Sequence, residues 1–259
     1  MTRSNTHAPA LALCAALLFQ LANPCECRAQ ARERELDVTL WQDWTVNGLL
    51  LAGWVIPELL KDRLAPDPCR WCDESAGRWD PPGIDRRARD FLVADRPSAP
   101  ALASDILAFG VLPAAALGVD FLSRSGDWNG ALDDATLIVQ GVAASAAANQ
   151  LVKFTAGRRR PYAHADPRPF ADDPDQNVSF YSGHTALAFS TVVSTSTVMY
   201  RRGSPYAPWV LGIGLPAAAG VGVLRIAADK HYLTDVLTGA LVGSAISFLV
   251  VWLHPVREE

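Results

Sequence analysis

Six long apolar segments alternate with polar connections along the chain. None of them shows the alternation of polar and apolar residues that marks a half-buried strand, and the chain contains no internal repeat. The pattern therefore predicts an all-α fold, a helical bundle with about five to six core helices. The predicted helices cover residues 38–60, 101–122, 135–152, 185–200, 207–224 and 236–253.

The last four of these segments carry no formal charge and approach ~18 residues, which is close to the length of a membrane span. Half of the 259 residues are hydrophobic and 19% are charged, whereas a soluble protein averages about a quarter charged residues. We therefore expect the bundle to be embedded in a membrane, and a soluble bundle with buried helices is the alternative. The net charge of -4 argues against general binding to nucleic acid.

Residues 1–31 resemble a secretory signal peptide. Arg3 precedes a short apolar core at residues 10–22, and Ala29-Gln30-Ala31 offers a cleavage site. An uncleaved anchor is the alternative, and Asn23-Pro24 before Cys25 makes a poor lipoprotein signal. The expected organisation is a signal peptide (1–31), an N-terminal helix with a polar extramembrane loop (32–100), and a helical catalytic domain (101–255).

The polar segment 61–100 contains Cys69 and Cys72. In an exported protein, two cysteines this close most simply form a local disulfide. A zinc site would need two further ligands, and a redox motif would need a thioredoxin-like βαβ pattern around it. The segment is therefore predicted to be an ordered extramembrane loop, with a short helix at residues 85–93.

The first candidate cluster for chemistry is Lys153, six residues, then Arg160-Pro161. On an unbroken helix the two cations would share a face, and Pro161 would stop that helix. A lysine and an arginine together suit a phosphate dianion. The alternative is a basic stop at the cytosolic end of a membrane helix.

The second cluster is Ser182-Gly183-His184, at the start of an apolar helix. Ser182 is a plausible N-cap, Gly183 lets the backbone approach an anion, and free N–H groups at a helix N-terminus bind anions. A solvated histidine near a helix cap is the alternative. The preceding stretch 162–180 has mixed charge and is predicted to be a solvated loop, with no role for its acids.

The third cluster is Arg225, five residues, His231, three residues, Asp235. At this spacing a helix would place His231 and Asp235 on one face, where the carboxylate can accept from one ring nitrogen and leave the other free. That arrangement is typical of an oriented nucleophile or base. A surface His–Asp pair is the alternative, and a metal site would need further ligands.

Taken together, the three clusters resemble the tripartite signature of the type 2 phosphatidic acid phosphatase (PAP2) superfamily, over about a third of the chain. Tyr181 stands where proline usually precedes Ser-Gly-His, and Leu224 where serine usually precedes the arginine. The resemblance implies that His231 attacks phosphorus to form a phosphohistidine and that Asp235 orients it. His184 would protonate the leaving group and then activate water. The phosphate oxygens would be held by Lys153, Arg160, Ser182, Gly183 and Arg225.

The resemblance also implies a phosphatase acting on a phosphomonoester or pyrophosphate without a metal or cofactor. The membrane setting favours a phosphorylated lipid as substrate: a phosphatidate, an isoprenyl pyrophosphate or a lipid A phosphate. The alternatives are a lipid phosphotransferase, a vanadium-dependent haloperoxidase built on the same cradle, and a catalytically silent membrane scaffold. The oligomeric state is left open.

The loop at residues 201–206 carries Arg201 and Arg202 and no acid, so the positive-inside rule places it in the cytoplasm. The three clusters then face the periplasm of a bacterial inner membrane. A cleaved signal would also leave the new N-terminus outside. Both hold only if residues 38–60 do not cross the membrane, so a packed or interfacial helix is predicted there, in keeping with its Asp43, Asn47 and Glu58.

Overall fold

A computed structural model describes residues 34–165 and 173–257. The described chain forms one compact unit that begins at Arg34. The expected signal peptide at residues 1–31 lies outside the described residues.

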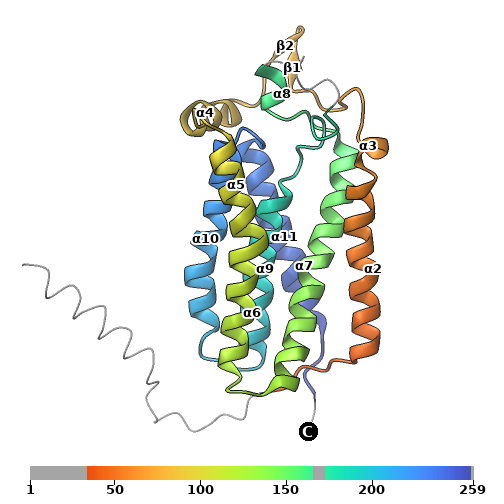
Figure 1. Ribbon diagram of the computed structural model, residues 1–259, viewed down its shortest axis with the longest axis vertical. Helices are drawn as coiled ribbons and strands as arrows, with labels where there is room; N and C mark the ends of the chain where they lie inside the picture. The colour runs from red at the N-terminus through yellow and green to blue at the C-terminus, as the bar shows by residue number, and fades with distance from the viewer. Residues whose placement is uncertain (1–33, 166–172, 258–259) are drawn as a thin grey trace, which may run out of the picture. The chain divides into compact units, whose positions relative to one another are not determined.

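Long helices run side by side along this unit (Figure 1). Consecutive helices are antiparallel, and the predicted all-α bundle is confirmed. The bundle helices are α2 (Leu40–Leu59), α5 (Ser98–Ile106) continued by the π-helical segment η1 (Leu107–Val111) and α6 (Leu112–Ser123), α7 (Trp128–Ala156), α9 (Gly183–Arg201), α10 (Ala207–Ala227) and α11 (Leu233–Leu253).

Short elements gather at one end of the bundle, where the loops are long (Figure 1). The predicted helix at residues 85–93 is present as α4, and the small β1–β2 hairpin was not predicted. These elements are α3 (Lys61–Leu64), β1 (Glu74–Ser75), β2 (Arg78–Trp79), α4 (Gly83–Leu92) and α8 (Tyr162–Ala165).

Helix α9 is the centre of the bundle, because it packs against α6, α7, α10 and α11. Several of its buried hydroxyl groups bond back to its own carbonyls, as Thr191 does to Leu187 O at 2.8 Å, whereas Ser196 Oγ donates to Ala207 O of α10 at 2.9 Å. The contact with α11 is especially close. A Cβ on Gly243 would lie 2.6 Å from Ala186 O, so only glycine allows this approach.

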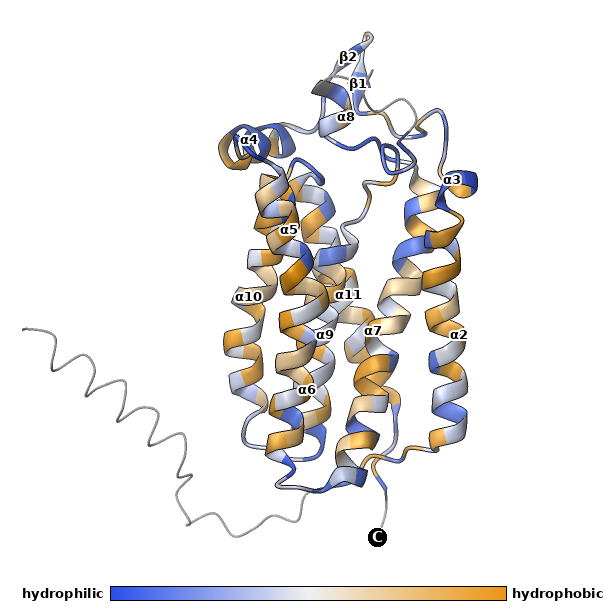
Figure 2. Cartoon of the chain, viewed as in Figure 1, coloured by the Kyte–Doolittle hydropathy of each residue, from blue (hydrophilic) through white to orange (hydrophobic). Residues whose placement is uncertain are grey.

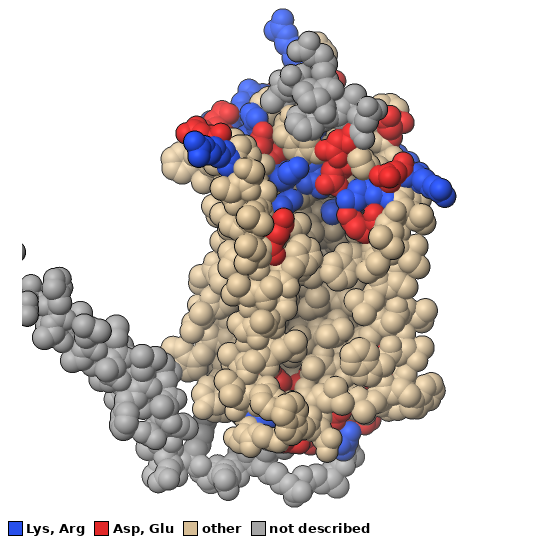
Figure 3. Space-filling view, in the orientation of Figure 1, with Lys and Arg blue, Asp and Glu red and all other residues tan. Residues whose placement is uncertain are grey.

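The outer surface of the bundle is apolar, as expected of a membrane protein. Figure 2 shows hydrophobic residues along the outside of the helices, and Figure 3 shows that most charged side chains lie at the two ends. Large side chains such as Leu122, Ile213, Leu241 and Leu253 are 70–77% exposed. In the described residues, the helices long and apolar enough to cross a membrane are Ser98–Ser123, Trp128–Ala156, Ala207–Ala227 and Leu233–Leu253.

Helix α2 runs along the bundle against α7, so of the two predicted arrangements for residues 38–60 it takes the packed one, and it is not among the described helices that are long and apolar enough to cross a membrane. Arg34 N, before the helix, donates to Arg202 O at 3.0 Å, whereas Glu58, in its last turn, accepts from Gln150 near the opposite end. The polar residues that argued against such a path have partners within the bundle. Asn47 Nδ2, for example, donates to Thr136 O at 3.1 Å.

This path of α2 affects the predicted topology. The start of the described chain lies beside the arginine loop 201–206, at the end opposite the three clusters. If α2 crosses the bilayer with the other helices and the arginine loop is cytoplasmic, the site faces the periplasm and the start of α2 lies in the cytoplasm. A cleaved signal peptide would instead leave the start of α2 in the periplasm.

Candidate active site

The three clusters meet at one end of the bundle because the helices that carry them are antiparallel (Figure 1). The C-terminal ends of α7 and α10 bring Lys153 and Arg225, and the N-terminal ends of α9 and α11 bring Gly183 and Asp235. Helix N-termini present free N–H groups, so this end of the bundle combines side-chain cations with backbone donors.

Helix α7 ends earlier than the sequence predicted. Gly157 takes a left-handed conformation (φ 57°) as C-cap, so the helix stops at Ala156 rather than at Pro161. Lys153 is therefore in the last turn of α7, while Arg160 lies in the loop that follows and not on the same helical face. The guanidinium of Arg160 is nevertheless fixed, because Nε donates to Asp175 O at 2.8 Å and Nη1 to Lys230 O at 3.3 Å.

The start of α9 lies directly against Lys153. Ser182 caps the helix by accepting from Thr185 N, and its own N–H donates to Asp235 O at 3.1 Å, which ties the second cluster to the third. Gly183 has no room for a side chain. An added Cβ would lie 2.7 Å from Asn149 Oδ1 and 3.3 Å from Lys153 Nζ.

His231 and Asp235 are close, but not as a pair on one helical face. His231 precedes α11, which starts at Leu233, because Asp235 accepts from Tyr232 N (3.0 Å) and so caps the helix at that point. His231 Nδ1 lies 2.9 Å from Ser179 O and 3.5 Å from Asp235 Oδ2, so the carbonyl is the closer partner. Ser179 Oγ in turn donates to Asp235 Oδ2 at 2.5 Å.

His231 is almost completely buried, with an exposed fraction of 2%. Burial lowers the pKa of its imidazole well below the usual value, and the positive charges of Arg160, Arg225 and Lys153 lower it further. The cations of the first and third clusters thus surround His231, and its ring is neutral at neutral pH. Because Nδ1 faces Ser179 O, Nε2 is the nitrogen left for chemistry.

His184 and Arg225 share a partner that the sequence interpretation missed. Asp105 Oδ1 of α5 lies 2.7 Å from His184 Nε2 and 3.3 Å from Arg225 Nη1. Arg225 Nη1 also donates to Ser104 Oγ at 3.2 Å, whereas its Nε is buried without a partner among the described residues. An arginine with an unused buried donor is suited to an oxyanion.

A cavity of about 320 Å³ opens beside Lys153, Gly183 and His184. Its polar rim includes Glu58, Asn149 and Gln150. The remaining wall is apolar and comes from α2, η1, α7 and α9: Trp54, Val55, Leu59, Phe109, Ala146 and Leu187.

Two acids next to the clusters were not singled out in the sequence. Asp105 lies within the predicted helix at residues 101–122, and Asp175 lies in the stretch 162–180, whose acids were assigned no role. In the structure Asp175 lies 2.8 Å from Lys61 Nζ and 3.7 Å from Arg160 Nη2. Repulsion among the clustered cations was a possible signal, because such a site needs nearby acids to balance its charge.

A profile of the PAP2 superfamily matches residues 134–259, which include all members of the three clusters. The chain belongs to this superfamily. Asp105, the part of the cavity wall from α2 and the cysteine pair lie before residue 134, so the match to the PAP2 profile does not include them.

Two curated relatives are similar to part of the chain. Over 136 residues the chain is 29% identical to a lipid A 1-phosphatase of Porphyromonas gingivalis, an alignment that covers 52% of this chain and 26% of that protein. Over 105 residues it is 32% identical to an undecaprenyl-diphosphatase of Sulfolobus acidocaldarius, with 40% of this chain and 48% of that protein covered. The alignments thus span about a quarter and about half of these relatives. No solved structure matches the chain significantly.

Proposed function

We propose that this PAP2 protein is a phosphatase that hydrolyses a phosphomonoester or pyrophosphate of a lipid through a phosphohistidine intermediate. The observation that carries the proposal is the cavity of about 320 Å³. Lys153, Gly183 and His184 line one side of it, and the opposite side is mainly apolar. A phosphate can lie against the cations while the hydrocarbon next to it lies against Trp54 and Phe109. The two relatives, which act on lipid phosphates by name, support the same substrate class.

In the proposed reaction, His231 Nε2 attacks phosphorus while the bond from phosphorus to the leaving oxygen breaks. Ser179 O accepts from Nδ1–H and so fixes the neutral tautomer that has its lone pair on Nε2. His184 gives a proton to the leaving oxygen. It then takes a proton from the water that attacks the phosphohistidine, which releases inorganic phosphate and restores His231.

The charge on the transferred phosphoryl group would be stabilised by the cations and by backbone N–H groups. We assign this role to Lys153, Arg160, Arg225, Ser182 and the Gly183 N–H. Phosphoryl transfer depends mainly on positioning and charge stabilisation, so this cradle has the components that the chemistry needs.

We further propose that residues 101–255 form the catalytic domain and that residues 32–100 supply the α2 part of the cavity wall and the polar loop. A signal peptide cleaved before Arg34 is not part of this proposal, because Arg34 N donates to Arg202 O at the end opposite the proposed periplasmic site. The active site is proposed to face the periplasm, because the loop with Arg201 and Arg202 lies at the other end of the bundle. Reporter fusions near residues 90 and 204 would test this orientation. They should report opposite sides, with residue 90 in the periplasm.

The function is tested by phosphate release from purified, detergent-solubilised protein, without added metal, on a panel of lipid and soluble phosphates. His231→Ala should abolish release. The matched control is His254→Ala, because His254 lies at the far end of the bundle, where its Nδ1 is 2.8 Å from Val250 O. Release that survives His231→Ala would contradict the mechanism. No release by folded wild-type protein would favour the transferase, haloperoxidase or scaffold alternatives.

His184→Ala separates the two proposed histidine roles. With p-nitrophenyl phosphate, whose leaving group needs no proton, this variant should still form the phosphoenzyme, whereas a lipid phosphate should not react. Rapid quenching at alkaline pH, where phosphohistidine is stable, would measure the phosphoenzyme. Its absence from every quench, with turnover intact, would argue against a covalent intermediate.

A further inference from the structure

Arg158, in the loop after α7, has every edge of its guanidinium engaged. Its side chain is completely buried, and its Nε, Nη2 and Nη1 lie 2.7, 2.9 and 2.6 Å from carboxylate oxygens of Asp73, Asp85 and Asp235. The resemblance to PAP2 proteins assigned no role to this residue. A buried arginine with three carboxylates is held far more firmly than a surface ion pair.

Both faces of the same guanidinium are covered by aromatic rings. The centroid of the Trp71 ring lies 4.3 Å from its central carbon, and that of the Tyr232 ring 4.0 Å. Cation–π contacts of this kind gain strength when they are desolvated. The position of Arg158 is therefore fixed in three dimensions by groups from separate parts of the chain.

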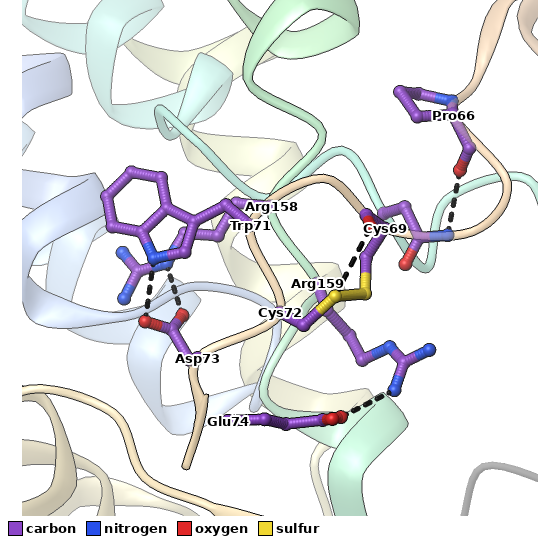
Figure 4. Close-up of a disulfide and its surroundings, with 9 residues drawn as sticks. Pro66, Cys69, Trp71, Cys72, Asp73, Glu74, Arg158 and Arg159 are labelled. Atoms are coloured by element: carbon purple, nitrogen blue, oxygen red, sulfur yellow. Dashed lines mark hydrogen bonds and ion pairs between the residues drawn. A yellow bond between two sulfur atoms is a disulfide. The ribbon is translucent and has the colours of Figure 1, made fainter. Parts of the chain in front are cut away.

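One of these groups, Trp71, belongs to the loop that the Cys69–Cys72 disulfide closes, and another, Asp73, directly follows that loop (Figure 4). Trp71 lies between the two cysteines, and its Nε1 donates to Asp73 Oδ1 at 2.8 Å. The loop backbone forms an isolated bridge with the segment that carries Arg158, where Arg159 N donates to Trp71 O at 3.0 Å. The disulfide thus holds Trp71 and Asp73 against Arg158.

On its other side, Arg158 is linked to the proposed nucleophile through two residues, Asp235 and Ser179. Asp235 Oδ1 accepts from Arg158, and Asp235 Oδ2 accepts from Ser179 Oγ at 2.5 Å. The carbonyl of Ser179 faces His231 Nδ1. A continuous series of polar contacts therefore runs from the disulfide loop to the imidazole.

We propose that Arg158 is a positioning residue for His231, and that the segment 69–73, which contains the disulfide, helps to hold the active site in place. This inference rests on the proposed function. Arg158 fixes the carboxylate of Asp235, which fixes Ser179 and with it the ring of His231. Among the described residues, no hydrogen bond or ion pair joins this segment to Lys153, Arg160, Ser182, Gly183 or Arg225. The expected effect of the segment is therefore on the chemical step and not on phosphate binding.

The test uses Asp73→Asn in the full-length protein, with Glu74→Gln as matched control. Asparagine keeps the size of Asp73 and leaves Arg158 paired with Asp85 and Asp235. The variant should therefore lose less folding stability than a variant of Arg158 itself. Glu74 is the neighbouring carboxylate and pairs with Arg159 at 3.1 Å on the surface (Figure 4).

In Asp73→Asn, loss of one buried charge-assisted hydrogen bond to Arg158 should lower kcat about tenfold. KM and the inhibition constant for inorganic phosphate should stay within about twofold, and Glu74→Gln should change neither.

A second arm tests the disulfide through a double-mutant cycle. Cys69→Ser/Cys72→Ser should lower kcat in the same way as Asp73→Asn, and the combined variant should show little further loss, because all three act through Arg158. A membrane-impermeant phosphine should lower the kcat of the wild type, but not of the serine variant. Fully additive effects, or an Asp73→Asn variant that behaves like Glu74→Gln, would overturn the inference.

Hydrogen exchange separates this inference from the proposed function. Tyr232 N donates to Asp235 Oδ2 and Thr234 N to Asp85 Oδ1, so amides of residues 232–234 should exchange faster in Asp73→Asn than in wild type or Glu74→Gln. Unchanged exchange overturns the inference, whatever the activity. If exchange is faster in Asp73→Asn but the wild type releases no phosphate, the structural link from the loop to Asp235 would be supported. The proposed phosphatase function would then be contradicted.

Discussion

Asp105 Oδ1 lies 2.7 Å from His184 Nε2, which places a carboxylate at the imidazole proposed to act as the proton donor. The same oxygen lies 3.3 Å from Arg225 Nη1, a proposed phosphate ligand. Asp105 precedes the π-helical segment η1, and such segments often occur at functional sites. The carboxylate and a phosphate would therefore compete for the same donors.

Asp105→Asn should change two kinetic constants in opposite ways. Without the negative charge, inorganic phosphate should inhibit about fivefold more strongly, because a like charge near the anion is removed. The kcat value should fall about tenfold, since His184 loses the carboxylate that holds its ring. Steady-state kinetics with phosphate as inhibitor would measure both, with Asp62→Asn, an acid in α3, as control. An unchanged inhibition constant would show that Asp105 does not face the bound phosphate.

Acidification should destabilise the protein through His231. Burial and the nearby cations keep the pKa of this residue well below about 6.5 in the folded state. The unfolded chain therefore binds a proton that the folded protein does not, so stability is lost as the pH falls below 6.5. Between pH 7.5 and 5.0 the wild type should lose about 2 kcal/mol more than His231→Asn. Parallel curves for the two proteins in thermal unfolding would contradict the lowered pKa.

The sequence was sufficient to predict the helices and the end of the bundle at which the clusters meet. The path of α2 along the bundle was not predictable from composition, because Asn47, the buried residue of this helix, looks unfit for a packed face until its partner is known. Asn47 donates to Thr136, which is 89 residues away in sequence. A local pattern does not contain such a distant pairing.

Within the site, spacing identified the cations and histidines but not the groups that hold them. Helical periodicity placed His231 and Asp235 on one face, whereas capping by Asp235 starts the helix after His231 and turns the ring toward Ser179 O. Similarly, Arg158 was passed over as a spacer between Lys153 and Arg160. Its importance comes from Asp73 and Asp85, which only the folded chain brings to it.

Gly183→Ala should weaken phosphate binding. An added methyl group would lie 2.7 Å from Asn149 Oδ1 and 3.3 Å from Lys153 Nζ, so the lysine would be displaced from the cradle. Inorganic phosphate should inhibit the variant about tenfold less strongly, as expected for one displaced charged donor. Gly220→Ala is the control, because nothing lies within 4 Å of a Cβ at that position in α10. Equal inhibition of the two variants would mean that the start of α9 does not contact the phosphate.

Trp54→Ala should affect lipid substrates and spare soluble ones. The Trp54 ring stacks with Phe109 at 6.5 Å across the cavity, and Phe109 meets the edge of His184 at 4.9 Å. Loss of this apolar wall should raise KM for a long-chain lipid phosphate about tenfold, with little change for p-nitrophenyl phosphate. Trp252→Ala removes a comparable stacked pair, with Phe248 at 5.2 Å, near the other end. If both substrates respond alike to Trp54→Ala, the cavity is not the site of the lipid chain.

Asp134→Asn should destabilise the bundle without changing the chemistry. At the end opposite the site, Asp134 accepts two hydrogen bonds from Arg124 at 2.7 and 2.8 Å, and it lies 3.2 Å from Arg202 Nε. Removing one partner of such a buried pair costs about 3 kcal/mol. Thermal unfolding in detergent should show this loss, whereas kcat and KM of the folded protein should match the wild type. Asp133→Asn, at the adjacent and less buried carboxylate, should have a much smaller effect. A kcat that falls with stability would indicate that this distant cluster is coupled to the active site through α7, the helix that carries both Asp134 and Lys153.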